Sequence, residues 1–234
     1  MIRSVDPGLQ IAATGMIAEQ VREDQLTNDL SNASTPGYKS DQSSQNDFSS
    51  ILLANMSSGK TIGQLATGVQ IGRTVTDLSA APLQTTNQPL DFGIAGTGFF
   101  AVRTPQGTAY TRDGQFSAAA NGTLVDQSGD PVLSQTGATV QVGPGGTVAP
   151  TALGVFNVPN AAKQGANLFT GAAAGRATGT VRSGALEASG VNAAETMVHM
   201  ISALQSYDAG QKTIQTFDDM LQRSASAVGA LGGS

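Results

Sequence analysis

Apolar residues recur at a spacing of three and four near the end of the chain. The positions are Met197, Met200, Leu204, Tyr207, Gln211, Ile214, Asp218 and Leu221, and six of these eight are apolar or aromatic. This spacing places them on one stripe of a helix, as in helices that pack against a partner helix. The pattern predicts a helix over residues 192–228, with Asn192 and Glu195 as a capping box and glycines after its end. A helix of this length with one narrow stripe needs a partner.

The first stretch of the chain has the same spacing and supplies a candidate partner. Its stripe consists of Ile2, Val5, Leu9, Ala12, Met16, Glu19, Glu23, Leu26 and Leu30. Pro7 suits the first turn of a helix, and proline and glycine within residues 34–37 favour a turn at its end. Glu19 and Glu23 interrupt the apolar stripe. We therefore predict that the terminal helices pair as a coiled coil, and that they are loose in the monomer and become ordered when copies pack together.

The middle of the chain has a period of two. Alternating apolar residues begin at Val69 and Ile71, and further short strands are predicted over residues 98–103, 108–111, 123–125, 132–133, 139–142 and 154–158. Turn sequences such as Asp113-Gly114 and Asn121-Gly122 separate them. Short strands joined by such turns are typical of an antiparallel all-β domain.

The predicted fold class is mixed α and β, with long N- and C-terminal helices that pair as a coiled coil and an inserted all-β domain. The predicted parts are an N-terminal helix with its following turn (1–39), an extended linker with one short ordered piece (40–67), the all-β domain (68–184) and a C-terminal helix (185–234) that pairs with the first part. A glycine- and alanine-rich stretch, residues 165–184, returns the chain to the last helix.

Charge and composition narrow the choice of partners. Twelve basic and seventeen acidic residues give a net charge of −5, which argues against nucleic acid or an anionic membrane as the main partner. Only 12% of the residues are charged, where about 25% is usual, and this suggests surfaces that pack against copies of the same chain. There is no cysteine, and hence no disulfide framework. No apolar run has the length of a secretory signal or a membrane span, and most such chains are cytosolic.

Candidate catalytic, metal and cofactor residues are weak throughout. His199 is the only histidine, which argues against metal sites with several histidines and against a serine–histidine–aspartate triad. The glycines of residues 93–98 lead into a strand, where a dinucleotide site needs a helix. Residues 126–130 lack a complete calcium loop. Asp91 and Asp113 could form a glycosidase pair, but a turn explains Asp113-Gly114 better. We predict no catalytic residue, no cofactor and no metal.

Three stretches carry a family resemblance. Residues 27–39, TNDLSNASTPGYK, resemble the N-terminal signature of the bacterial flagellar rod and hook family, although Asp29 and Ser31 depart from it. Residues 91–102 with 110–116 resemble the β-domain motif of that family, and residues 184–207 resemble its C-terminal motif. The signature positions that match are Asn28, Leu30, Asn32, Thr35, Gly37, Tyr38 and Lys39.

The resemblance implies a structural subunit of the flagellar basal body. Members of the family leave the cell through the flagellum's own type III export apparatus without a cleaved signal peptide, and they assemble helically around a central channel with paired terminal helices as the inner tube. The implied partners are the chain itself, other rod and hook subunits and the export apparatus, with no nucleic acid and no small-molecule substrate. The implied location is the basal body in the cell envelope, which is the periplasm where an outer membrane is present, and it replaces the cytosolic prediction.

The stripes then become candidate assembly interfaces. These residues are Leu9, Met16, Leu26, Leu30, Met197, Met200, Leu204, Tyr207, Ile214 and Leu221. In the signature, Asn28, Asn32 and Gly37 are candidates for fixing the turn after the helix, although ordinary helix termination explains the asparagines equally well.

Several functions remain open on the sequence. Residues 68–72 and 83–87 resemble subunits of the distal part of the rod, and we expect this role. A proximal rod or hook-type subunit is the alternative within the family. Outside it, the alternatives are an enzyme or sugar-binding β domain with helical oligomerisation ends, and a secreted self-assembling or adhesive protein.

Overall fold

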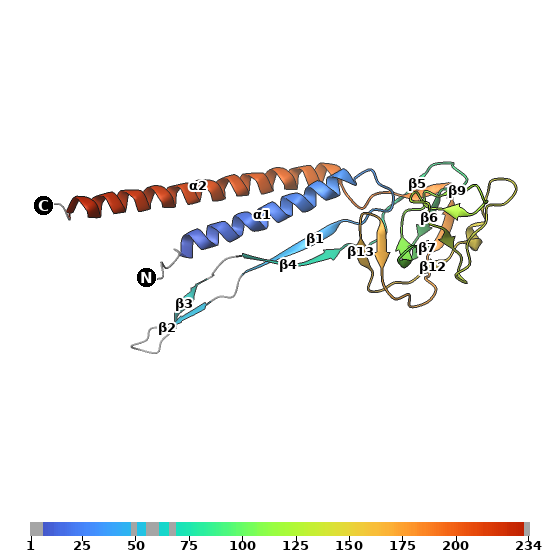
Figure 1. Ribbon diagram of the computed structural model, residues 1–234, viewed down its shortest axis with the longest axis horizontal. Coiled ribbons are helices and arrows are strands. Elements are labelled where there is room, and N and C mark those ends of the chain that lie inside the picture. Colours follow the sequence, from blue (N-terminus) through green and yellow to red (C-terminus); the bar gives the residue numbers. More distant parts are fainter. Residues whose placement is uncertain (1–6, 48–50, 55–60, 66–68, 232–234) are drawn as a thin grey trace. The chain divides into compact units, whose positions relative to one another are not determined.

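The computed structural model describes residues 7–47, 51–54, 61–65 and 69–231, and within them the chain is a mixed α and β protein (Figure 1). Helix α1 spans Pro7–Ser31 and helix α2 spans Ala193–Leu231. By its internal contacts the chain divides into two compact units. Unit 1 comprises Met1–Asn28, Gln42–Val75 and Ala194–Ser234, and unit 2 comprises Asp29–Asp41 and Thr76–Ala193.

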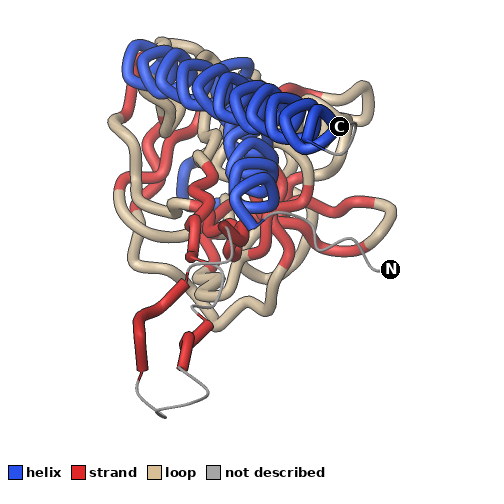
Figure 2. The backbone as a smooth tube through the Cα atoms, turned by 90° about the vertical axis from the view of Figure 1, so that its left-hand side faces the viewer, coloured by secondary structure: helices blue, strands red, loops and turns tan. Residues whose placement is uncertain are grey.

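Unit 1 contains nearly all of both helices and most of four strands. Strand β1 (Asp41–Asp47) pairs with β4 (Val69–Thr76), and β2 (Ile51–Ala54) pairs antiparallel with β3 (Thr61–Leu65). Figure 2 separates these helical and strand segments by colour. The sequence predicts only one short ordered piece before residue 68, because β1 reads DQSSQND and has no apolar alternation. Backbone pairing, which needs no particular side chain, accounts for a strand in so polar a stretch.

The largest sheet of unit 2 has six strands. Its strand order is β11–β7–β8–β14–β13, with β12 also paired to β7, and all its pairs are antiparallel, as the sequence predicts. The bounds are Phe99–Thr104 for β7, Gly107–Thr111 for β8, Val132–Leu133 for β11, Val155–Phe156 for β12, Ala162–Gln164 for β13 and Leu168–Thr170 for β14.

Three two-stranded sheets and a 3-10 helix, η1 (Pro150–Ala152), complete the described part of unit 2. Strand β5 (Leu83–Thr85) pairs with β16 (Ala185–Glu187), β6 (Phe92–Ala95) with β15 (Thr180–Ser183), and β9 (Ser117–Ala118) with β10 (Leu124–Val125). The strand predicted over residues 139–142 is wrong, because this segment makes only single bridges, Thr123↔Gln141 and Leu133↔Thr139. The glycine- and alanine-rich stretch contains β14 and β15 rather than being only a connection.

Both faces of strand β7 are buried. Phe100 belongs to one apolar cluster with Phe92 and Phe116, whereas Phe99 belongs to a second cluster with Tyr110 and Phe169. Successive side chains of a strand point to opposite faces, so these adjacent phenylalanines serve two cores. Phe100 and Phe116 meet edge to face at 5.3 Å between ring centroids, and Phe99 and Phe169 lie 5.2 Å apart. Unit 2 is therefore a well-packed β domain that can hold a fixed geometry at its edges.

Candidate functional site: a buried joint of three motifs

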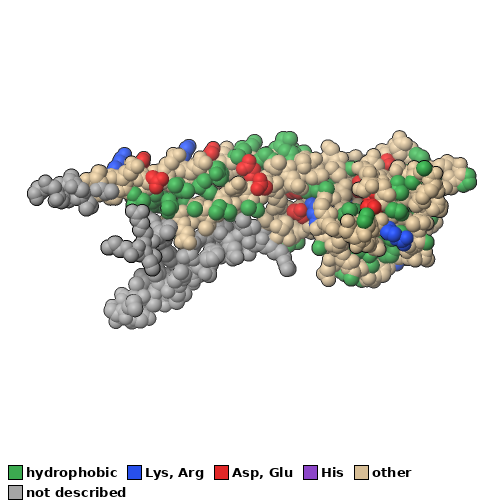
Figure 3. All heavy atoms as spheres, in the orientation of Figure 1, with side chains coloured by type: hydrophobic (Ala, Val, Ile, Leu, Met, Phe, Trp, Pro, Cys, Tyr) green, Lys and Arg blue, Asp and Glu red, His purple; other side chains and the backbone are tan. Residues whose placement is uncertain are grey.

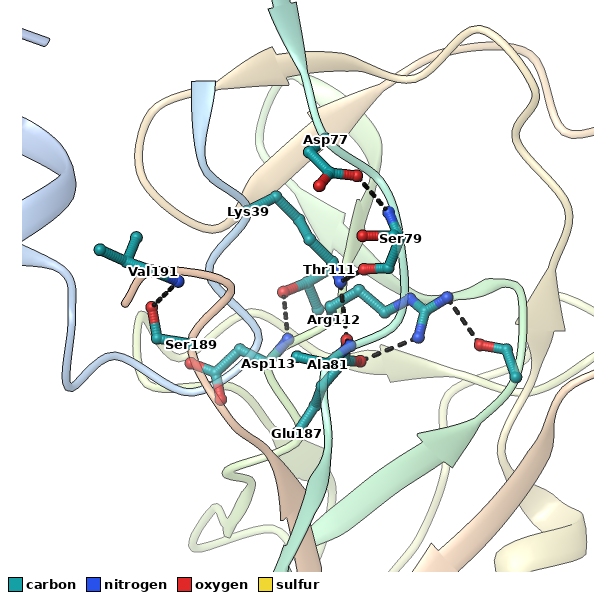
Figure 4. Close-up of polar contacts among 11 residues, drawn as sticks. Lys39, Asp77, Ser79, Ala81, Thr111, Arg112, Asp113, Glu187, Ser189 and Val191 are labelled. Atoms are coloured by element: carbon teal, nitrogen blue, oxygen red, sulfur yellow. Dashed lines mark hydrogen bonds and ion pairs between the residues drawn. The ribbon is translucent and has the colours of Figure 1, made fainter. Parts of the chain in front are cut away.

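The three stretches that resemble family motifs meet at one buried carboxylate, Glu187 of β16 (Figure 4). Its Oε1 atom accepts a hydrogen bond from Lys39 Nζ at 2.6 Å and another from the backbone N–H of Ala81 at 2.8 Å. Its Oε2 atom accepts from Arg112 Nη1 at 2.8 Å. Lys39 belongs to the N-terminal signature, Arg112 to the β-domain motif and Glu187 to the C-terminal motif. We call these four residues the Glu187 joint.

The two cations of the joint are held by backbone as well as by Glu187. Lys39 Nζ also donates to the carbonyl of Ser79, and Arg112 Nη2 donates to the carbonyl of Gly96 at 2.9 Å. The side chains of Lys39, Arg112 and Glu187 are at most 2% exposed. Charges this deeply buried are stable only when paired and hydrogen-bonded, so loss of one partner is costly. The joint therefore fixes the relative positions of the chain segments that carry the motifs.

Gly37 places the signature against the Arg112 segment. Its φ is +67°, in the left-handed region that favours glycine. A Cβ atom at this position would lie 2.3 Å from the carbonyl carbon of Arg112. The N–H of Gly37 donates to the backbone carbonyl of Glu187 at 2.9 Å. The signature glycine is thus required by both backbone conformation and close approach.

Tyr38 forms a second buried contact beside the joint. Its hydroxyl donates to Asp29 Oδ1 at 2.7 Å, and Lys163 Nζ lies 4.0 Å from the centre of its ring. Burial raises the pKa of Asp29 above its ordinary value, although the bond from Tyr38 opposes the shift. Burial, and then the bond to Asp29, also raise the pKa of Tyr38. Lys163 further donates to the carbonyl of Lys39 at 2.8 Å and to Asp41 Oδ2 at 2.9 Å, so β13 also holds the signature.

The segment after β16 binds backbone carbonyls of the signature. Ser189 Oγ donates to the carbonyl of Asn32 at 3.0 Å, and the N–H of Gly190 donates to the carbonyl of Tyr38 at 2.9 Å. Ser189 Oγ also accepts from the N–H of Val191 at 3.2 Å. The C-terminal motif therefore touches the signature at several points before α2 begins.

The structure places the predicted signature residues unequally. Gly37, Tyr38 and Lys39 are buried in unit 2, and Asn32 Oδ1 accepts from Thr35 Oγ1 at 3.3 Å in the turn after α1. Leu30 is half-buried and Asn28 is exposed, and the role of Asn28 in fixing the turn stays a prediction.

Sequence reasoning missed Asp29, Arg112 and Glu187 as site residues. In the sequence Asp29 is only a departure from the family pattern, yet in the structure it binds the signature tyrosine. A carboxylate within the apolar run of Ala185, Leu186 and Ala188 was the available signal for Glu187. A charged residue inside such a run is seldom buried without a partner.

The predicted assembly residues differ in their exposure to solvent. Leu9, Met16, Leu26, Leu30, Met200, Tyr207 and Ile214 are half-buried, whereas Met197, Leu204 and Leu221 are exposed. Figure 3 shows apolar side chains along the helical part of the surface. The exposed fractions reach 51% for Met197, 42% for Leu204 and 52% for Leu221, while the neighbouring Ala203 is buried. Their role in assembly stays a prediction.

The described residues contain no group of three or more histidine, cysteine, aspartate or glutamate side chains placed to hold a metal ion. Among these same parts of the chain, neither helix is long and apolar enough to cross a membrane.

The polar atoms of the Glu187 joint are directed at one another, as in a contact that holds a fold together. The model "Flagellar basal body rod FlgEFG protein C-terminal" matches residues 182–227, and the model "Flagellar hook protein FlgE/F/G D1 domain" matches residues 93–165. The chain is 31% identical to the flagellar basal-body rod protein FlgG of Buchnera aphidicola subsp. Schizaphis graminum, over 93% of this chain and 98% of the relative.

Two proteins of Bacillus subtilis are also similar. Its flagellar basal-body rod protein FlgG is 31% identical, over 95% of this chain and 97% of the relative. Its flagellar hook-basal body complex protein FlhO is 28% identical, over 96% of this chain and 99% of the relative. The chain belongs to the flagellar basal-body rod and hook protein family.

Proposed function

We propose that this chain is a structural subunit of the flagellar basal-body rod, in its distal part, and that it polymerises helically into a hollow shaft that transmits torque from motor to hook. The observation that carries the proposal is the Glu187 joint, where residues from all three family motifs form ion pairs in one buried cluster. A subunit that transmits torque must resist deformation, and paired buried charges with fixed geometry supply such resistance.

The two terminal helices supply the polymerisation surface in this proposal. Met197, Ile201 and Leu204 of α2 are 42–56% exposed, which leaves apolar surface in water. Burial of such surface contributes about 25 cal/mol per Å², so contact with a neighbouring copy stabilises the polymer. The helices of each subunit then pair as a coiled coil in the polymer. Each subunit consists of four parts, which are residues 1–39, 40–67, 68–184 and 185–234. Hydrogen exchange on the monomer tests this account, which expects weak protection over residues 8–30 and 195–221.

The remaining parts of the proposal concern route and partners. The chain passes through the flagellar type III export apparatus without a cleaved signal peptide, and it lies in the cell envelope, in the periplasm where there is an outer membrane. Its partners are other copies and other rod and hook subunits, and it catalyses no reaction. The near full-length similarity to relatives named as basal-body rod proteins supports this assignment.

A hook-type or other rod position within the same family is the second candidate. It is favoured by the similarity to the protein named as a hook-basal body complex protein, which extends over 96% of this chain. The two positions differ in which subunits lie above and below the polymer, so the site of the defect in a cell without the chain distinguishes them.

A filament assay with the purified chain tests the proposal. We expect straight tubes in electron micrographs of the concentrated full-length protein, and no tubes from a variant without residues 193–231. Monomers at every concentration would contradict self-assembly. A binding or enzymatic activity that persists after removal of both helices would support the rival β-domain function.

A further inference from the structure

Glu19 interrupts the apolar stripe of α1, and the structure gives it unusual surroundings. Its Oε2 atom is shielded from solvent and has no hydrogen-bond partner among the described residues. A carboxylate oxygen removed from water without a donor costs free energy. A donor that arrives later, on assembly, would recover that cost.

Glu19 faces a groove within unit 1. The groove has a volume of about 350 Å³ and is lined by residues that include Gly15, Met16 and Glu19 of α1 and Ser206, Gly210 and Thr213 of α2. Gly15 has open space around it, and a Cβ atom at Gly210 would lie 2.8 Å from Met16 Cγ. Among the described residues that line the groove, Glu19 is the only charged one. The groove is therefore wide enough for a side chain from outside and has a single negative charge to receive it.

We propose that Glu19 receives a basic side chain, Lys212 or Arg223, from α2 of a neighbouring copy. These are the only lysine and arginine of α2, and both are exposed. Neither forms an ion pair with any of the residues that the structure describes. Opposite charge on two surfaces of one chain suits a head-to-tail contact between identical subunits. This inference rests on the proposed polymerisation and specifies one contact in it.

The contact has a competitor within the same chain. Arg22 lies three residues after Glu19 on α1, a spacing at which side chains can meet on one helix. No Glu19–Arg22 pair occurs in the structure. An intramolecular pair would stabilise the monomer, whereas the proposed pair stabilises only the polymer. The stability of the monomer therefore distinguishes the two pairs.

Sedimentation of the full-length chain over a range of concentrations gives the critical concentration for polymerisation. We expect Glu19→Gln, which keeps the shape but removes the charge, to raise it about tenfold, since one partner of a shielded pair is lost. Glu23→Gln is the matched control, because Glu23 is the other acidic residue of the stripe and is not part of the groove lining. It should change the critical concentration less than about twofold. Circular dichroism should show equal helicity in all monomers, and the thermal midpoint of the Glu19→Gln monomer should be no lower than that of the wild type, because a neutral amide costs less to bury than a carboxylate.

A charge exchange identifies the partner. Glu19→Lys should prevent polymerisation, and the addition of either Lys212→Glu or Arg223→Glu should restore it. Two results would overturn this contact and leave the proposed function standing. One is a wild-type chain that polymerises with the same critical concentration as Glu19→Gln. The other is a defect of Glu19→Lys that neither charge exchange relieves. A drop in the monomer's thermal midpoint with Glu19→Gln and with Arg22→Gln would assign Glu19 to Arg22 and also overturn it. A wild-type chain that never polymerises would refute the proposed function itself.

Discussion

Lys39 Nζ and Glu187 Oε1 lie 2.6 Å apart in a buried ion pair between residues separated by 148 positions in the sequence. Lys39 of the signature, which lies after α1, and Glu187 of the C-terminal motif, which lies before α2, thus depend on each other for burial. Such distant contacts form only after a large loop has closed, so we infer that the signature is ordered late in folding.

Glu187→Gln tests the importance of this pair. The amide leaves Lys39 and Arg112 buried without a compensating charge, and we expect a loss of about 3–5 kcal/mol in the free energy of unfolding. Urea denaturation followed by near-ultraviolet circular dichroism measures it. Asp208→Asn is the control, because Asp208 is exposed on α2 and its loss should cost less than about 0.5 kcal/mol. Equal stability of the two variants would refute the structural role of the joint.

Gly37→Ala should be more harmful than alanine at another left-handed glycine. Gly129 has φ of +87° but nothing within 4 Å of an added Cβ, whereas at Gly37 the Cβ meets the Arg112 backbone. Gly129→Ala should therefore cost only the conformational penalty of about 1–2 kcal/mol. Gly37→Ala should cost at least about 2 kcal/mol more, as overpacking adds to that penalty. Thermal unfolding of both variants provides the comparison, and equal midpoints would show that the signature can move away from Arg112.

Asp29 should make stability fall as pH rises, whereas most acidic residues in folded proteins make it rise. Its pKa is raised by burial from the ordinary 3.8, so the folded chain holds this proton more tightly than the unfolded chain. The contribution of Asp29 to stability is therefore complete below the ordinary pKa and is lost as pH rises through the raised pKa. Asp29→Asn keeps an oxygen for Tyr38 and should remove this component.

Unfolding of the wild type and Asp29→Asn between about pH 3 and pH 7 measures this component. The stability of the wild type relative to the variant should fall as pH rises. Asp77→Asn is a contrasting control, because the Ser79 N–H lowers the Asp77 pKa and the wild type should gain relative stability as pH rises. A wild-type advantage over Asp29→Asn that grows with pH would contradict the assigned shift.

Ile201→Ser should separate assembly from folding. Ile201 is 56% exposed on α2, so the monomer should unfold within about 0.5 kcal/mol of the wild type. In a polymer that buries this face, the same change should raise the critical concentration by about tenfold, equivalent to about 1.4 kcal/mol. Ser202→Ala, at the adjacent exposed position, is the control for changes in helix propensity. Unchanged polymerisation of Ile201→Ser would exclude this face from the interface.

The fold can be predicted from the sequence where local patterns of residues determine the structure. The strand predicted over residues 98–103 corresponds to β7, and the helix predicted over residues 192–228 corresponds closely to α2, because the spacing of apolar residues distinguishes a helix from a strand. The segment 139–142 has apolar residues at alternate positions, but its neighbours offer single bridges in place of a ladder. Strand β1 was missed because hydrogen bonding to β4 requires no apolar pattern.

The candidate site is harder to predict from the sequence, because it depends on contacts between distant segments. The signature points to Lys39, but spacing along the chain does not reveal its partners Glu187 and Ser79. Arg112 likewise meets Glu187 across 75 positions. Gly37 was correctly expected to need special dihedrals, whereas its close approach to Arg112 is visible only in three dimensions.

Electron microscopy of basal bodies from the source bacterium, with this gene deleted, tests the assigned role most directly. The account predicts rods that end short of their full length and carry no hook, and restoration by the wild-type gene. Complete rods with attached hooks in the deleted strain would contradict the role of this chain as a rod subunit.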